Sequence, residues 1–114
     1  MIKVTCRKQD EITILDLEGS IDLEGVDALK EAISRERQAG CTKLVLNMEK
    51  VASILSTILN RFQPTVTAFW APGGRMVLIN TSTGNLRILE KTQFSKMLMF
   101  ASSEEEAIQK LKAS

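Results

Sequence analysis

The sequence predicts an α/β domain in which a mixed sheet of four to five strands is packed against about four helices, mainly on one face. Two observations support this prediction. From Gly19 onward, short apolar segments alternate with segments of helical periodicity, a pattern that implies crossover connections and parallel strands. In addition, the segments 44–46 and 76–79 are apolar without alternation, which is typical of strands that are covered on both faces.

The first two strands are expected to form an antiparallel hairpin. Apolar and polar residues alternate over 2–7, as they do in a half-buried strand at the edge of a sheet. A turn at 10–11 leads into a β-rich segment over 12–17, and Gly19 is expected to end this second strand.

A helix is predicted after the hairpin, because Val26, Leu29 and Ile33 recur at helical spacing with charged residues on the opposite face. Gly40 stands where a helix ends in a residue of left-handed conformation. The apolar strand over 44–46 follows, and residues 47–50 are expected to form a turn after it.

A second helix is predicted from Ser56 to Trp70. Ser56 precedes an apolar periodic segment, so its hydroxyl is expected to cap this helix by accepting from first-turn N–H groups. Pro64 lies inside the predicted helix and has no N–H to donate to the Asn60 carbonyl, so a bend or local break is expected there. Phe69 and Trp70 are expected to pack in the core.

The rest of the chain is predicted to add two strands and two helices. The strand over 76–79 follows a Gly-Gly turn, and Leu86 and Leu89 indicate a short helix after it. A last short strand is expected at 98–100. The segment 102–106 contains two overlapping capping boxes, so the final helix is expected to begin there.

The composition fits one globular domain over residues 1–114. Apolar residues make up 44% of the chain and charged residues 25%, which is ordinary for a soluble globular protein. No apolar segment is long enough to span a membrane and no signal peptide is evident, so we expect a cytoplasmic protein. The net charge of +1, without a basic tail, gives no sign of a nucleic-acid or membrane partner. The most buried residues are expected to be Leu29, Ile33, Leu44, Val45, Leu46, Val77, Leu78 and Ile79.

The sequence offers little for catalysis. It contains no histidine, the commonest general base and the commonest metal ligand. It also lacks a phosphate-binding glycine-rich loop and a Cys-x-x-Cys motif. We therefore expect no enzyme, no catalytic residues, no metal and no cofactor. Cys6 and Cys41 lie in different segments and are expected to be buried, reduced thiols.

Several motifs, in this order and spacing, resemble the STAS domain, the fold of bacterial anti-sigma factor antagonists. Residues 17–22 (LEGSID) are similar to that family's second strand, glycine and Ile/Leu-Asp pair. Residues 43–48 sit where the family has an apolar strand ending in Asp-Leu, with Asn47 in place of the aspartate. Residues 74–80 resemble its Gly-Arg, apolar strand and Asn. The resemblance covers nearly the whole chain and implies a STAS-like fold.

The family's phosphorylation signature, Asp-Ser-Ser/Thr-Gly-Leu/Ile, corresponds to residues 55–59. Ser56 and Thr57 retain the phosphoacceptor serine and the hydroxyl that follows it, whereas Leu55 replaces the aspartate and Ile58 replaces the glycine. The resemblance therefore implies that Ser56 is a candidate phosphoacceptor whose phosphorylation is weak or lost. A phosphate there would add about two negative charges and disrupt a partner contact.

The resemblance further implies a non-enzymatic module that binds an anti-sigma factor or a related serine kinase in a partner-switching pathway. We expect a monomer or a weak dimer. One alternative is that Ser56 and Asp22 are only helix caps. Another is a STAS domain that senses a small ligand or a nucleotide. The residues expected to contact the partner are Asp22, Leu23, Ser56, Thr57, Ile58, Asn60 and Arg61.

Overall fold

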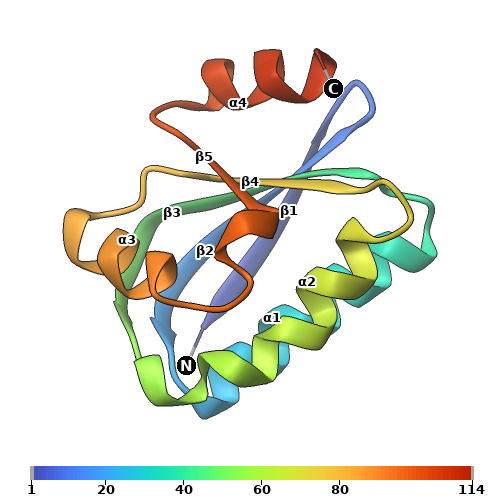
Figure 1. The fold of residues 1–114 in the computed structure, drawn as a ribbon. Helices are drawn as coiled ribbons and strands as arrows, with labels where there is room; N and C mark the ends of the chain where they lie inside the picture. The colour runs from blue at the N-terminus through green and yellow to red at the C-terminus, as the bar shows by residue number, and fades with distance from the viewer. Residues whose placement is uncertain (1, 114) are drawn as a thin grey trace.

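The computed structural model describes residues 2–113 and shows a five-stranded sheet with helices on both faces (Figure 1). β1 is antiparallel to β2, and all the other neighbouring strands are parallel. The predicted mixed sheet is therefore confirmed. The strands follow one another across the sheet in chain order, and they are β1 (Lys3–Gln9), β2 (Ile12–Ile21), β3 (Lys43–Ile54), β4 (Arg75–Ile79) and β5 (Leu98–Ala101).

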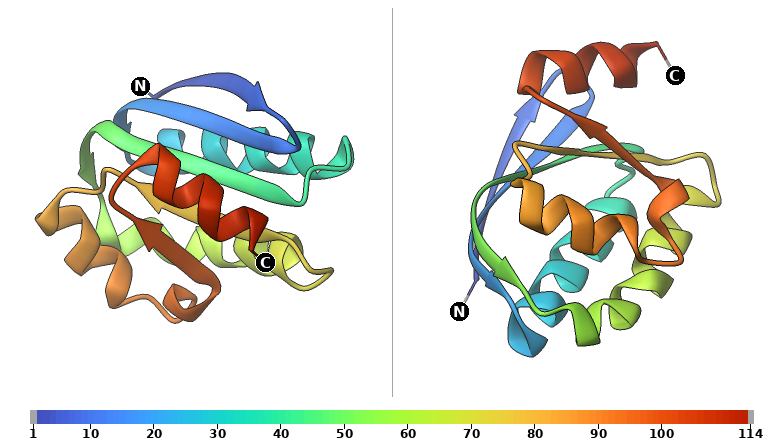
Figure 2. Two further views of the ribbon diagram at one scale, coloured as in Figure 1. Left: turned by 90° about the horizontal axis from the view of Figure 1, so that it is seen from above. Right: turned by 60° about the vertical axis from the view of Figure 1, so that its left-hand side comes forward.

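Three α-helices cover one face of the sheet and a single helix covers the other (Figures 1 and 2). The helices α1 (Leu23–Gln38), α2 (Gln63–Trp70) and α3 (Thr83–Glu90) lie on the first face, and α4 (Glu104–Lys112) lies on the second. The prediction of about four helices, mainly on one face, is confirmed. None of the described helices is long and apolar enough to cross a membrane.

The hydrophobic core lies on both faces of the sheet, because successive side chains of a strand point to opposite faces. In β3, Leu44 and Leu46 belong to the larger cluster under α1, α2 and α3, whereas Val45 belongs to the smaller cluster under α4. The eight residues expected to be most buried are all at most 2% exposed: Leu29, Ile33, Leu44, Val45, Leu46, Val77, Leu78 and Ile79.

The strands β2 and β3 are longer than the sequence predicted. β2 continues past Gly19, and the segment 47–50, which was predicted to be a turn, lies inside β3. The reason is that the two strands pair along their whole length, so that Glu18 faces Lys50 after a register shift. Such a shift accommodates an extra residue in one strand, which hides a regular period of two in the sequence.

The predicted helix over 56–70 consists of two segments with different winding. The first is a 3₁₀ segment, η1 (Ser56–Phe62), and α2 begins at Gln63. Pro64 thus lies in the first turn of α2, where its missing N–H removes no helical hydrogen bond. The break expected at Pro64 takes the form of this change from 3₁₀ to α winding at Gln63, with no non-helical residue between Ser56 and Trp70. The Asn60 carbonyl is not left unpaired, because it accepts from the Gln63 N–H.

Two side chains that were predicted to be buried lie at the surface. Phe69 is buried as predicted, but Trp70 is 41% exposed, and the Arg75 guanidinium carbon lies 5.6 Å from its ring centroid in a cation–π contact. Cys6 is exposed on the edge strand β1, and Cys41 is half-buried. The apolar character of a residue was therefore not sufficient to predict its burial on an edge strand, as for Cys6, or at a helix end, as for Trp70.

Candidate functional site

The start of α1 lies directly after the carboxyl end of β2. Asp22 is the helix N-cap, and its Oδ1 accepts from the Gly25 N–H at 2.8 Å. The cap reading of Asp22 is therefore confirmed as a structural role. A side chain at Gly25 would place its Cβ only 2.4 Å from the Ser20 carbonyl oxygen, so glycine allows α1 to approach the strand end this closely. Leu23, the first residue of α1, is 51% exposed.

The segment η1 begins beside the start of α1, because β3 ends next to β2. The Leu55 N–H donates to the Ile21 carbonyl at 2.9 Å and joins the chain just after β3 to the last residue of β2. Ser56 and Thr57, which follow, are exposed, whereas Ile58 is half-buried and packs against the core.

Ser56 does not form the cap that the sequence predicted. Leu55 occupies the N-cap position of η1, its carbonyl accepts from the Ile58 N–H at 3.2 Å, and no side chain caps the segment. Because η1 is a 3₁₀ segment, its hydrogen bonds close over three residues, and Ser56 is already inside the first turn. Within residues 2–113 the Ser56 hydroxyl forms no hydrogen bond, and the side chain is exposed to solvent.

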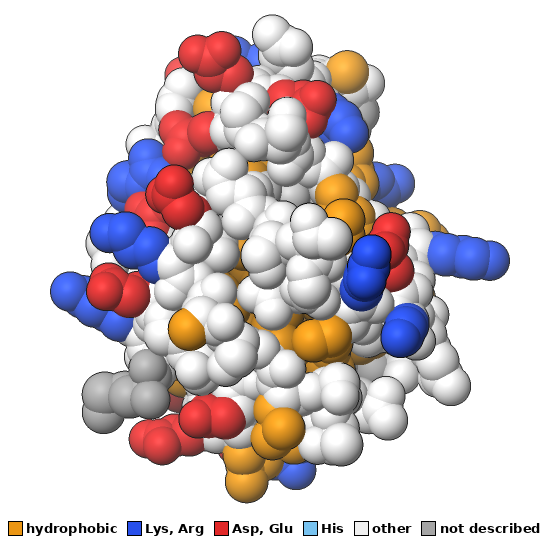
Figure 3. All heavy atoms as spheres, turned by 90° about the vertical axis from the view of Figure 1, so that its left-hand side faces the viewer, with side chains coloured by type: hydrophobic (Ala, Val, Ile, Leu, Met, Phe, Trp, Pro, Cys, Tyr) orange, Lys and Arg blue, Asp and Glu red, His pale blue; other side chains and the backbone are white. Residues whose placement is uncertain are grey.

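Asn60 and Arg61 are exposed farther along η1. An Arg61 Nη2 lies 3.5 Å from Asp27 Oδ1 on α1, a surface ion pair that links the two segments. All seven residues that the sequence assigned to partner binding thus lie on two adjoining segments, the start of α1 and η1. Figure 3 views the end of the molecule where β2–β5 terminate, and there hydrophobic side chains reach the surface at the lower edge, close to acidic ones.

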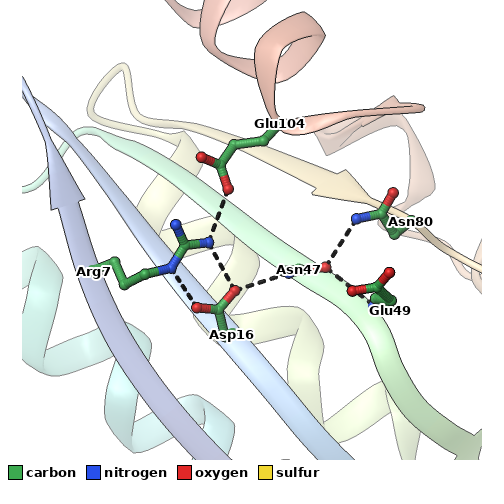
Figure 4. Close-up of polar contacts among 6 residues, drawn as sticks. All are labelled: Arg7, Asp16, Asn47, Glu49, Asn80 and Glu104. Carbon is green, nitrogen blue, oxygen red and sulfur yellow. Dashed lines mark hydrogen bonds and ion pairs between the residues drawn. The ribbon is translucent and has the colours of Figure 1, made fainter.

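A polar network that the sequence analysis did not predict lies on the face of the sheet that α4 covers (Figure 4). Arg7 on β1 donates to both carboxylate oxygens of Asp16 on β2 and, at 2.8 Å, to Glu104 at the start of α4. Asp16 also accepts from Asn47 Nδ2 at 2.8 Å, and Asn47 Oδ1 accepts from Asn80 Nδ2 at 3.2 Å. The network joins β1, β2 and β3 to the start of α4 and to the residue after β4.

The hydrogen bonds from Arg7, and then from Asn47, hold the pKa of the Asp16 carboxyl below its usual value. The hydrogen bonds that Arg7 donates, to Asp16 first and to Glu104 second, raise the pKa of the Arg7 guanidinium. An aspartate inside an otherwise apolar strand was the signal that the sequence offered for this network. Its groups are satisfied by one another, and among the described residues no group of three or more Cys, Asp or Glu side chains is arranged to hold a metal ion. We therefore interpret the network as structural.

The model of the STAS domain family matches residues 3–107 of this chain. Among solved structures, an anti-sigma factor antagonist from Mycobacterium paratuberculosis is 18% identical, with a TM-score of 0.83 over 98% of this chain and 95% of that one. The anti-sigma factor antagonist SpoIIAA of Bacillus, in its unphosphorylated form, is 22% identical, with a TM-score of 0.77 over 98% of both chains.

A third solved structure is RsbS of Moorella thermoacetica with a serine-to-glutamate substitution. It is 16% identical, with a TM-score of 0.75 over 97% of this chain and 96% of that one. At these identities the likeness to the solved structures shows a shared fold. A comparison with curated sequences gave no match.

Proposed function

The chain belongs to the STAS domain family, and on that premise we propose that it is a non-enzymatic regulatory module. In this proposal it binds an anti-sigma factor or a related serine kinase in a partner-switching pathway. The observation that carries the proposal is the surface formed by the start of α1 and by η1, which gathers Asp22, Leu23 and an exposed, unbonded Ser56 hydroxyl. The shared fold with SpoIIAA, an antagonist solved in phosphorylated and unphosphorylated forms, supports it.

Ser56 is the phosphoacceptor candidate within this proposal. A phosphate on its exposed hydroxyl would place about two negative charges in the middle of the surface and weaken a partner contact by repulsion and desolvation. Leu55 and Ile58 flank the serine, and neither offers the carboxylate or the open backbone that the family signature has at these positions. We therefore expect slow phosphorylation at most, with docking as the main activity.

The proposal is tested by affinity capture from the native host with three baits: the wild-type chain, Ser56→Ala and Ser56→Asp. We expect the wild-type chain and Ser56→Ala to retain the same anti-sigma factor or serine kinase, identified by mass spectrometry, and Ser56→Asp to lose it. Thr42→Asp is the matched control, because it adds the same charge at an exposed position at the other end of β3.

The outcomes of this capture separate the two parts of the proposal. Equal retention of the partner by Ser56→Asp would refute the phosphorylation switch but leave the binding module in place. Retention of no regulatory protein by any of the baits would contradict the proposed function itself.

The slow phosphorylation is tested separately by restoring the family residues with Leu55→Asp and Ile58→Gly. After incubation with the captured kinase and ATP, intact-mass spectrometry should show a larger phosphorylated fraction in the double variant than in the wild-type chain. The melting temperature of the double variant is the control, because Ile58 packs against the core and its loss also affects stability. An unchanged phosphorylated fraction in a folded variant would show that these two residues do not limit the reaction.

A further inference from the structure

Two large hydrophobic side chains are exposed together at the surface around Ser56. Leu23 is 51% exposed at the first residue of α1, and Leu55 is 49% exposed immediately before Ser56. The hydrogen bond from the Leu55 N–H to the Ile21 carbonyl brings the two chain segments together. A single exposed leucine is ordinary on a protein surface, but two on adjoining segments bring exposed hydrophobic surface to the same part of the molecule.

Ile58, three residues after Leu55, is half-buried and packs against the main hydrophobic cluster. Elsewhere in the described chain, Trp70 is the remaining large hydrophobic side chain with comparable exposure, and it already stacks against Arg75. Leu23 and Leu55 differ from Trp70 in that they lie on two segments that a backbone hydrogen bond joins. We define these two leucines together as the leucine pair.

Acidic groups border the leucine pair. Asp22 precedes Leu23, and Glu24 follows it in the first turn of α1. Within residues 2–113 neither carboxylate forms an ion pair. Asp27, one turn farther along, is balanced by Arg61. The rim of the leucine pair therefore carries an excess of negative charge, which favours a partner surface with Lys and Arg at the corresponding positions.

We infer that the leucine pair is the centre of the docking surface and that its occupant is a partner protein that presents apolar side chains bordered by Lys and Arg. This inference rests on the proposed function, because it concerns the same surface and gives the chemistry of its partner. Leu55 is then a specificity-determining residue: it makes an apolar contact directly beside Ser56, where an aspartate would make a charged one.

The test uses the partner identified by the capture experiment, purified and titrated against the full chain by isothermal calorimetry. Leu55→Asn removes the apolar contact at nearly constant side-chain size and adds no charge. We expect the Kd to rise by about tenfold or more for Leu55→Asn and for Leu23→Asn, as for residues at the centre of an interface. Trp70→Ala is the matched control, with similar exposure on a different helix end, and should change the Kd less than about twofold.

The charged rim is tested by the salt dependence of the same titration. Glu24→Gln should weaken binding at low salt and reduce the dependence of Kd on salt concentration, because it removes one rim charge. Leu55→Asn should weaken binding at all salt concentrations and leave the salt dependence unchanged. Circular dichroism verifies that each variant is folded, as expected for exposed positions.

Failure of the inference and failure of the proposed function give different results. If the identified partner binds Leu55→Asn and Leu23→Asn as tightly as the wild-type chain, the leucine pair is not the docking centre, while the binding function stands. If binding strengthens when Glu24 is neutralised, the predicted basic rim of the partner is wrong. If no regulatory partner is captured, the proposed function fails and the inference fails with it.

Discussion

Asn47 shows how much a single residue decides in this molecule. It stands where the family sequence has an aspartate, and its Nδ2 donates to Asp16 Oδ1 at 2.8 Å. A carboxylate in its place would put two negative charges within hydrogen-bond distance, so the amide allows Asp16 to remain ionised. Arg7 approaches the same carboxylate from β1 and also contacts Glu104. The Asp16 carboxylate thus accepts hydrogen bonds from side chains on both neighbouring strands, Arg7 on β1 and Asn47 on β3.

These hydrogen bonds to Asp16 predict how stability depends on pH. Because Arg7 lowers the pKa of Asp16 in the folded state, the ionised carboxylate stabilises the fold above its unfolded pKa of about 3.9, and this contribution is lost as the pH falls through the folded value. Arg7→Met should move the pKa of Asp16 upward in an NMR titration and flatten the loss of stability below about pH 4. Lys8→Met, on the same exposed strand, is the control and should leave the Asp16 titration unchanged.

The role of the Ser56 hydroxyl is tested by comparison with a true cap. Ser103 Oγ accepts from the Glu106 N–H at 3.2 Å at the start of α4, whereas the Ser56 hydroxyl forms no such bond. Ser103→Ala should lower the free energy of unfolding by about 1 kcal/mol, and Ser56→Ala should change it by less than about 0.5 kcal/mol. Equal losses in chemical denaturation would restore the cap interpretation of Ser56.

At the scale of elements, the site depends on how α1 meets β2 and on how η1 follows β3. A single residue, Asp22, separates the end of β2 from the start of α1, and this short connection is possible because Gly25 leaves room for the Ser20 carbonyl. On the other side of the site, the chain has 3₁₀ winding through η1, so α2 begins only at Gln63 and Pro64 lies in the first turn of α2. The two segments that carry the candidate residues are therefore fixed by their junctions with the sheet.

The junction of α1 with β2 is tested by two glycine substitutions. Gly25→Ala should lower the free energy of unfolding by about 1 to 3 kcal/mol, because the new Cβ would overlap the Ser20 carbonyl oxygen and force α1 to move. Gly84→Ala on α3 is the matched control, since nothing lies within 4 Å of a Cβ there. The control should leave stability unchanged or raise it by up to about 1 kcal/mol through helix propensity. A Gly25→Ala variant as stable as the wild-type chain would contradict the tight junction.

At the scale of the whole molecule, the two faces of the sheet are protected unequally. The larger core cluster lies under three helices, whereas the cluster that includes Ile14, Val45 and Val77 is covered by α4. Beyond its packed side chains, α4 is held by the Arg7–Glu104 ion pair and by the bond from Lys110 Nζ to the Phe100 carbonyl at 2.8 Å. The attachment of this one helix therefore determines whether the smaller core cluster remains shielded from water.

The dependence on α4 is tested with Leu111, which is completely buried. Leu111→Ala should lower the free energy of unfolding by about 2 to 5 kcal/mol and increase hydrogen exchange in α4, as expected for a truncated core leucine. Gln109→Ala, exposed on the same helix, is the control and should change stability by less than about 0.5 kcal/mol. Unchanged exchange in Leu111→Ala would show that α4 does not depend on this contact.

The sequence by itself determined the order of the elements and the residues of the central core. Apolar runs such as 44–46 and the helical spacing of Leu29 and Ile33 are local patterns, and their burial follows from hydrophobicity that can be read within a few positions. The motifs also identified both segments of the candidate site. They could not show that the chain segments of Leu23 and Leu55 adjoin, because 31 positions separate the two residues and the chain passes through α1 and β3 before the segments meet.

Only the tertiary structure decided the length of β3, the winding of η1 and the contacts of Asp16. The segment 47–50 is polar enough to form a turn, but pairing with β2 extends the strand through it, and a strand partner is not encoded locally. Ser56 has the residue type of a cap, but the backbone turn that would use its hydroxyl begins at Leu55 instead. Arg7 and Glu104 are 97 positions apart, so their ion pair exists only because the sheet order places β1 within reach of the start of α4.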